Sequence, residues 1–286
     1  LERFHGVQDP AAVNAAWPYL GDADPALRFA ARTAIEWQDP ASWQARALAE
    51  LDPRKSIDAI IALARVSGRD EFHRPPTAPA PDKALQSQMI AALDRIDWKS
   101  LPVSDKLALL RAYHLTFIRL GRPDVETQSR LIAKFDPHLP SPHREINWEL
   151  AETLIYLEAP SAAAKVMALL RDAPSPAFYG TPEFANPILR PRVPGTTGGL
   201  TNVYLSKQED QIQYAQILRG LQTGWTPELR EEYLRWFVSA YSTYRGGTSF
   251  LMSLRTIRTD ALAMMPEGDR QALADVIAIP LDAGAP

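Results

Sequence analysis

The sequence predicts an all-α protein, a solenoid of about twelve or thirteen antiparallel helices with one long irregular loop over residues 172–206. Three observations lead to this fold class. An Asp-Pro dipeptide recurs at nearly even steps, the segments that follow it carry apolar residues at helical spacing, and no segment requires a strand. Spacing this regular means that repeat architectures are considered before any other fold.

The Asp-Pro dipeptides mark expected helix starts. They begin at Asp9, Asp24, Asp39 and Asp52, in steps of fifteen, fifteen and thirteen residues. An Asp side chain accepts hydrogen bonds from the free N–H groups of a helix's first turn, and Pro at the first helical position loses no bond that would otherwise form. Each step corresponds to one helix of about three turns plus a short connection.

The segment after Asp24 has the clearest apolar stripe. Its apolar residues fall at i, i+3, i+4, i+7 and i+8, namely Leu27, Ala30, Ala31, Ala34 and Ile35. Arg28, Arg32 and Glu36 lie off this stripe and are expected in solvent. The segment 10–20 is expected to form a partner helix, so that the two make a helical hairpin.

The same pattern continues to residue 171. Helices are expected over 40–51, 53–66, 83–96, 104–120, 124–135, 146–157 and 161–171. Four prolines make 67–82 an exposed loop. The segment 172–206 is rich in proline and glycine, and its aromatic residues predict that it packs along the array. The predicted organisation is therefore N-terminal repeats over 1–171, the loop over 172–206, and C-terminal repeats of the same solenoid over 207–286.

The C-terminal segment resumes the helical pattern. A helix over 208–223 is expected to end at Gly224, and Thr226 followed by Pro is expected to begin the next. That next helix has the densest aromatic stripe of the chain, formed by Leu229, Tyr233, Trp236, Phe237, Ala240, Tyr241 and Tyr244. Helices over 250–264 and from residue 266 complete the predicted array.

Composition excludes several classes of chemistry. The chain has 286 residues, with 31 Lys and Arg against 34 Asp and Glu, and its net charge of −3 disfavours a general nucleic-acid binder. It has no Cys, which excludes disulfides, thiolate zinc sites, iron–sulfur clusters and Cys nucleophiles. No apolar run reaches the ~20 residues of a membrane span. Because the sequence starts at Leu1 without a signal sequence, we expect a processed protein or a piece of a longer one.

Histidines and glutamates give only weak signals of metal binding or catalysis. His138 and His143 lie in a proline-rich connection without a third imidazole, so we predict surface histidines and no metal site. His114 lies on an apolar helix face and is expected to be buried beside a neighbouring partner. Glu145 and Glu149 lie four apart on one helix face, the arrangement behind an alternative in which paired carboxylates hydrolyse a carbohydrate. We predict no catalytic, cofactor-binding or metal-binding residue.

Two turns in the C-terminal part form the preferred contact site with a partner. They supply Trp225, Tyr244, Arg245, Gly246 and Gly247, which combine aromatic rings, a guanidinium donor and backbone N–H groups exposed by glycine. Trp, Tyr and Arg dominate interface energetics. The alternative is that the glycines only turn the chain between helices and that most of the aromatic residues pack in the core.

Several motifs resemble those of a known family. The segments QEDQIQYA (208–215), LR (218–219), GWT (224–226) and YRGGTSF (244–250) occur in this order, with AARTAIE (30–36) and WQARAL (43–48) nearer the N-terminus. They resemble the HEAT-like helical-repeat region of large exported multi-domain bacterial proteins of the planctomycete type. That region often lies beside c-type cytochrome or sugar-dehydrogenase-like propeller domains. The family often has His where Gln213 stands, so a ligand role at this position is lost.

The resemblance implies export, to the periplasm or the cell surface, and redox-associated neighbours. With the repeat pattern, it predicts a non-catalytic protein-interaction or scaffolding module of a larger protein, with no cofactor of its own. Its partner would be another protein or a covalently linked redox domain. A carbohydrate-active helical toroid is the alternative, and a nucleic-acid-binding HEAT array, whose binding would fall steeply with salt, is the third.

Overall fold

The computed structural model describes residues 1–69, 71–73, 75, 77, 79–173, 206–243 and 248–282. Over these residues the protein is all-α, with fourteen α-helices, six 3-10 helices and no strand, which confirms the predicted class. The α-helices outnumber the predicted twelve or thirteen because the last predicted helix forms two short ones. The predicted loop 172–206 lies almost entirely outside the described residues. None of the described helices is both long and apolar enough to cross a membrane.

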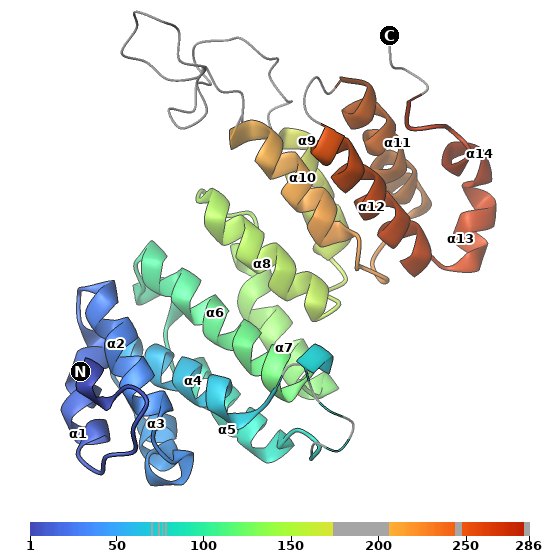
Figure 1. Ribbon diagram of the computed structural model, residues 1–286. Coiled ribbons are helices and arrows are strands. Elements are labelled where there is room, and N and C mark those ends of the chain that lie inside the picture. Colours follow the sequence, from blue (N-terminus) through green and yellow to red (C-terminus); the bar gives the residue numbers. More distant parts are fainter. Residues whose placement is uncertain are drawn as a thin grey trace, which may run out of the picture. The chain divides into compact units, whose positions relative to one another are not determined.

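The chain divides into two compact units of helices (Figure 1). Unit 1 comprises Leu1–Leu131 and His143–Glu149, and unit 2 comprises Ile132–Pro142 and Leu150–Pro286. The helices up to residue 131 are η1 (Glu2–Phe4), α1 (Ala12–Ala16), η2 (Trp17–Gly21), α2 (Pro25–Glu36), η3 (Pro40–Ser42), α3 (Gln44–Ala49), α4 (Pro53–Ser67), η4 (Glu71–His73), α5 (Lys83–Asp94), η5 (Trp98–Ser100), α6 (Val103–Leu120) and the start of α7 (Val125–Phe135). The start of α8 (Arg144–Tyr156) also belongs to unit 1.

Unit 1 contains two rows of packed helices. α2, α4 and α6 are successive neighbours in one row, while α3 and α5 contact each other and pack on α4. α4 is central, and every residue from 57 to 64 is buried. A Cβ at Gly68 would lie 2.6 Å from the carbonyl oxygen of Arg119, so a glycine there lets the end of α4 approach α6 closely.

The four Asp-Pro aspartates all bind backbone N–H groups, as predicted. Each Oδ1 accepts one hydrogen bond, in the pairs Asp9–Ala11 (2.8 Å), Asp24–Ala26 (2.8 Å), Asp39–Ala41 (3.0 Å) and Asp52–Lys55 (2.9 Å). Asp24 and Asp52 directly precede the long helices α2 and α4. Asp39 precedes only the 3-10 helix η3, and Asp9 lies ahead of α1.

Two predicted helices are interrupted. The segment 10–20 is α-helical only to Ala16 and continues as η2, because Pro18 lacks the N–H that an α-helix needs at this position. The segment 40–51 divides into η3 and α3 at Trp43, whose φ is −135° and whose side chain is buried. The chain leaves the helix at Glu50, so that Leu51 is 79% exposed.

Unit 2 contains the remaining helices. They are the end of α7, η6 (Asp136–His138), the rest of α8, α9 (Ala162–Asp172), α10 (Ser206–Leu218), α11 (Pro227–Thr243), α12 (Thr248–Met264), α13 (Glu267–Ala272) and α14 (Ala274–Ile277). α11 contacts α9, α12 and α14. α10 ends at Leu218 rather than at residue 223, because Gly220 weakens the helix there. Gly224 has φ +75°, and a Cβ on it would lie 2.6 Å from the Pro160 carbonyl oxygen, so only glycine fits.

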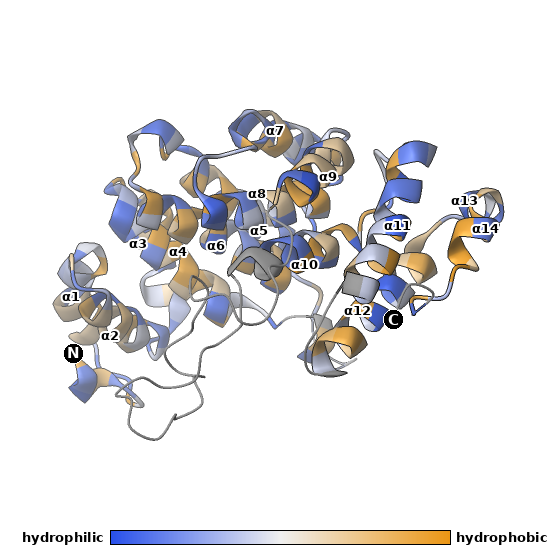
Figure 2. Cartoon of the chain, turned by 90° about the horizontal axis from the view of Figure 1, so that it is seen from above, coloured by the Kyte–Doolittle hydropathy of each residue, from blue (hydrophilic) through white to orange (hydrophobic). Residues whose placement is uncertain are grey.

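Among the described residues, the aromatic stripe of α11 is buried at its centre and half-buried elsewhere. Tyr233, Phe237 and Ala240 are buried, and the Phe237 ring packs edge-on against Tyr233 with centroids 5.0 Å apart. On another side of the helix, Leu234 packs in a cluster with Leu273, which lies between α13 and α14, and with Val276 of α14. Figure 2 shows that most helices carry both hydrophobic and hydrophilic residues, as helices buried on one side do.

Candidate functional site

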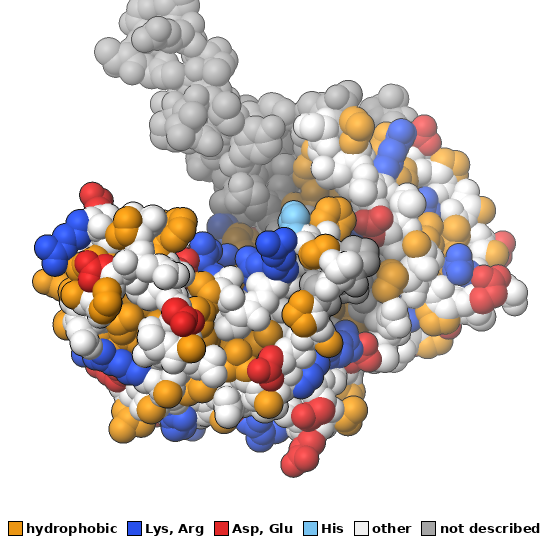
Figure 3. All heavy atoms as spheres, turned by 60° about the horizontal axis from the view of Figure 1, so that its bottom comes forward, with side chains coloured by type: hydrophobic (Ala, Val, Ile, Leu, Met, Phe, Trp, Pro, Cys, Tyr) orange, Lys and Arg blue, Asp and Glu red, His pale blue; other side chains and the backbone are white. Residues whose placement is uncertain are grey.

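The candidate binding site of unit 1 is a groove of about 380 Å³ that is lined by residues of α2, α4 and α6. Its lining is rich in arginine, with Arg28, Arg32, Arg54, Arg65 and Arg111. Asp58 and Asp105 are its two carboxylates, and Ile57, Ile61 and Leu115 are among its apolar residues. The space-filling view shows Lys and Arg side chains gathered at a hollow of the surface (Figure 3). We call this feature the arginine groove.

Asp58 is the centre of the groove's ion pairs. Arg32 Nη1 lies 2.9 Å from Asp58 Oδ1, and Arg28 Nε lies 3.6 Å from Oδ2. Burial raises the pKa of the Asp58 carboxyl, and the two arginines oppose this rise because they favour the ionised form. The ionised carboxylate of Asp58, only 6% exposed as a residue, therefore depends on the two guanidinium groups that α2 supplies.

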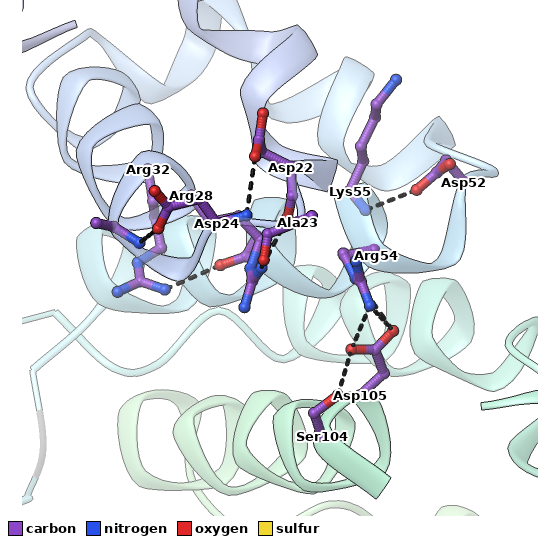
Figure 4. Close-up of polar contacts among 12 residues, drawn as sticks. Asp22, Ala23, Asp24, Arg28, Arg32, Asp52, Arg54, Lys55, Ser104 and Asp105 are labelled. Atoms are coloured by element: carbon purple, nitrogen blue, oxygen red, sulfur yellow. Dashed lines mark hydrogen bonds and ion pairs between the residues drawn. The ribbon is translucent and has the colours of Figure 1, made fainter. Parts of the chain in front are cut away.

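Backbone and carboxylate oxygens also hold Arg28 and Arg54 in place (Figure 4). Arg28 Nη1 also donates to the carbonyls of Asp22 and Ala23, at 2.7 and 3.1 Å. Arg54 binds Asp105 through two nitrogens, Nη2 at 2.8 Å and Nε at 3.1 Å, so that α4 is joined to α6. Such two-point guanidinium contacts restrict orientation as well as adding energy.

Arg65 and Arg111 have N–H groups that no described residue accepts from. Arg65 donates through Nε to Glu36, whose carboxylate also lies 3.4 Å from Arg32 Nε. Its terminal nitrogens make no hydrogen bond to any residue that the structure describes. Arg111 is exposed, and within the described part of the chain it forms no hydrogen bond or ion pair, although its charge helps lower the pKa of Glu149.

His114 and Glu149 pair at the start of α8 within unit 1. The atoms His114 Nδ1 and Glu149 Oε2 are 3.2 Å apart, and this hydrogen bond is the largest of the effects that lower the pKa of Glu149. The half-buried imidazole thus has the neighbouring partner that the sequence predicted. Glu145 is exposed and lies 3.8 Å from Arg144 Nε. The two carboxylates considered for carbohydrate hydrolysis therefore have different partners.

The residues of the predicted contact site are only partly described. Trp225 is half-buried, its Nε1 donates to the Leu221 carbonyl at 2.8 Å, and its ring centroid lies 5.4 Å from that of Tyr233. Arg230 lies over the same ring, with its guanidinium carbon 5.2 Å from the centroid. These internal contacts suit a structural role in the turn before α11. Partner binding there stays a prediction, because Tyr244, Arg245, Gly246 and Gly247 lie outside the described residues.

The two other histidines considered in the sequence lie in separate units. His138 is half-buried at the end of η6 in unit 2, and His143 is exposed ahead of α8 in unit 1.

The sequence interpretation missed the arginine groove. It placed Arg28, Arg32 and Glu36 in solvent, but their side chains are only 22%, 19% and 14% exposed and form ion pairs. One signal pointed to them. Asp58 lies in an otherwise apolar stretch of its helix, where a buried carboxylate needs a charged or hydrogen-bonding partner.

No family model, curated protein or solved structure matches this chain. The resemblance to HEAT-like regions therefore stays a prediction from the motifs. What the fold and the groove define is an all-α protein with a basic, partly apolar surface groove.

Proposed function

We propose that this chain is a non-catalytic protein-interaction module with a HEAT-like solenoid architecture, and that the arginine groove is its binding surface. One observation carries the proposal. Three successive helices of one row, α2, α4 and α6, contribute side chains to a single groove, and ion pairs join each helix to the next. Helical-repeat proteins typically bind partners along a surface of this kind.

The groove is also held in place before a partner arrives. The contacts of Arg32 with Asp58 and of Arg54 with Asp105 hold guanidinium groups that would otherwise have many rotamers. Binding to an ordered surface costs less conformational entropy than binding that must first order it. These ordered guanidinium groups support recognition as the role of the groove.

The biological setting is part of the same proposal. The motifs shared with HEAT-like regions of exported bacterial proteins suggest a place within a larger exported, redox-associated protein. The partner would then be a separate protein or a covalently linked redox domain.

Native co-purification tests the proposal. The tagged chain should retain a defined partner from the organism that makes it, and haem absorbance in the complex would support the redox setting. Exchange of Arg65 and Arg111 for Glu should abolish retention, while Arg235→Glu on α11 should not. A chain that remains monomeric without any partner at micromolar concentration would contradict the proposal.

A further inference from the structure

We infer that the arginine groove binds an extended acidic segment of a partner protein, with carboxylates at Arg65 and Arg111 and an apolar side chain against Phe29. The inference rests on the proposed function and adds the chemistry of the partner.

The charge of the groove is not balanced by its own residues. Five arginines face Asp58 and Asp105, and Glu36 joins them from the C-terminal end of α2. An excess of two positive charges remains, and it falls to one if Glu149 is counted against Arg111. An anionic partner would complete this surface, because its carboxylates can accept from the unused donors of the guanidinium groups.

Those unused donors come from two different helices. Arg65 on α4 binds Glu36 only through Nε, and the structure gives its terminal nitrogens no acceptor among the described residues. Arg111 on α6 is exposed. A ligand that uses both must extend across neighbouring helices, which favours an extended segment over a single small anion.

The groove also has an apolar contribution that a purely ionic site would not need. Phe29 is 58% exposed at the groove, and the guanidinium carbon of Arg32 lies 5.5 Å from its ring centroid. Ile61 and Leu115 line the same groove. An exposed aromatic ring beside apolar side chains is suited to an apolar side chain of the ligand.

A nucleic acid fits these observations less well. Phosphate-backbone binding gains affinity from many basic contacts along a track, whereas Arg28, Arg32 and Arg54 are already engaged with aspartates. A short acidic segment with apolar residues is the better match.

Fluorescence anisotropy on the full chain tests the inference. The probe is a labelled dodecapeptide in which Asp and Glu alternate with Leu and Phe, compared with a peptide that has Asn and Gln in place of the acids. The double variant Arg65→Gln with Arg111→Gln should weaken binding of the acidic probe by about tenfold or more, since each contact is charge-assisted. Its circular dichroism should stay unchanged because both side chains are accessible.

Two matched variants serve as controls. Arg235→Gln removes an exposed α11 arginine that also donates through Nε to a glutamate at 2.8 Å, and it should leave affinity unchanged. Phe29→Ala should weaken binding by a few fold without altering its salt dependence, whereas Phe72→Ala, which removes another exposed ring outside the groove lining, should have no effect.

Failure of the inference is distinguishable from failure of the proposed function. The inference is overturned if the acidic probe does not bind, if it binds the double variant as well as the original chain, or if a single-stranded oligonucleotide of equal charge binds more tightly. A partner that co-purifies equally with the double variant also overturns it, yet leaves the interaction role in place. Absence of any partner removes the proposed function whatever the peptide does.

Discussion

The arginine groove of unit 1 and the aromatic helix α11 of unit 2 use their distinctive side chains in opposite ways. In unit 1, charged residues from three helices line a groove and pair across helix boundaries. In unit 2, α11 carries a stripe of aromatic residues, of which Tyr233 and Phe237 are buried. The side chains that usually dominate interfaces thus stabilise the core in unit 2, while charges that resemble a solvent face form the groove in unit 1.

The comparison teaches that the neighbouring helix decides the role of a stripe. An aromatic stripe becomes core when other helices cover it, as α9, α12 and α14 contact α11. A charged stripe becomes a structured surface when the next helix presents an opposite charge, as Asp58 on α4 does to Arg32 on α2. Single substitutions test both the burial of the α11 aromatic residues and the role of the groove's ion pairs.

The largest effect is expected from Phe237→Ala in unit 2. The ring is fully buried and contacts Tyr233 and Trp236, so its removal leaves a cavity and should lower the free energy of unfolding by about 3–5 kcal/mol. Urea denaturation followed by circular dichroism measures this. Phe29→Ala in unit 1 is the control, because that ring is exposed and should cost under about 1 kcal/mol. Equal effects of the two substitutions would contradict the assignment of the α11 aromatics to the core.

The second effect concerns Asp58→Asn. The substitution keeps the shape but leaves Arg28 and Arg32 without their shared carboxylate, and breaking a buried pair in this way should cost about 3 kcal/mol. Urea denaturation again reports the change, with the exposed Glu145→Gln as the control. If Asp58→Asn is as stable as the original chain, the ion pairs do not organise the groove.

A structural feature can be predicted from the sequence when the residues that cause it are close together in the chain. The starts of α2 and α4 follow from Asp24 and Asp52, which cap within three residues, so their positions were predicted correctly. The break at Trp43 was missed because it comes with burial of the indole, which depends on tertiary packing. The groove was missed for the same reason. Arg32 and Asp58 are 26 residues apart, and helical periodicity does not report which helices become neighbours.

A smaller effect is expected from Tyr233→Phe. The Tyr233 hydroxyl donates to the carbonyl of Ala215 inside unit 2, and loss of this buried bond should cost about 1–2 kcal/mol. Burial raises the pKa of Tyr233 above its ordinary value, and that of Tyr113 in unit 1 likewise. The neutral phenols therefore stabilise the fold fully below the unfolded-state pKa of about 10, and this stability declines as the pH rises above it.

The pH dependence of unfolding separates the stabilisation by the Tyr233 hydrogen bond from the effect of its raised pKa. In urea denaturation between pH 9 and 11, roughly the range around the phenol pKa, the original chain should lose stability more steeply than Tyr233→Phe, which lacks this buried phenol. Identical pH slopes would mean that Tyr233 is accessible to solvent and that its side of α11 is not core.

The smallest effect is expected at the ion pair between Arg171 of α9 and Glu232 of α11. Two nitrogens of Arg171 contact the carboxylate at 2.8 and 3.1 Å, but the two side chains are 53% and 40% exposed. Because water and salt screen such a pair, Arg171→Ala should change the free energy of unfolding by under about 0.5 kcal/mol, and added salt should shrink even this difference. Asp58→Asn, measured in the same salt series, should keep most of its cost because its partners are less exposed. A larger, salt-resistant loss at Arg171 would show that exposed ion pairs in unit 2 organise helices as the groove pairs do in unit 1.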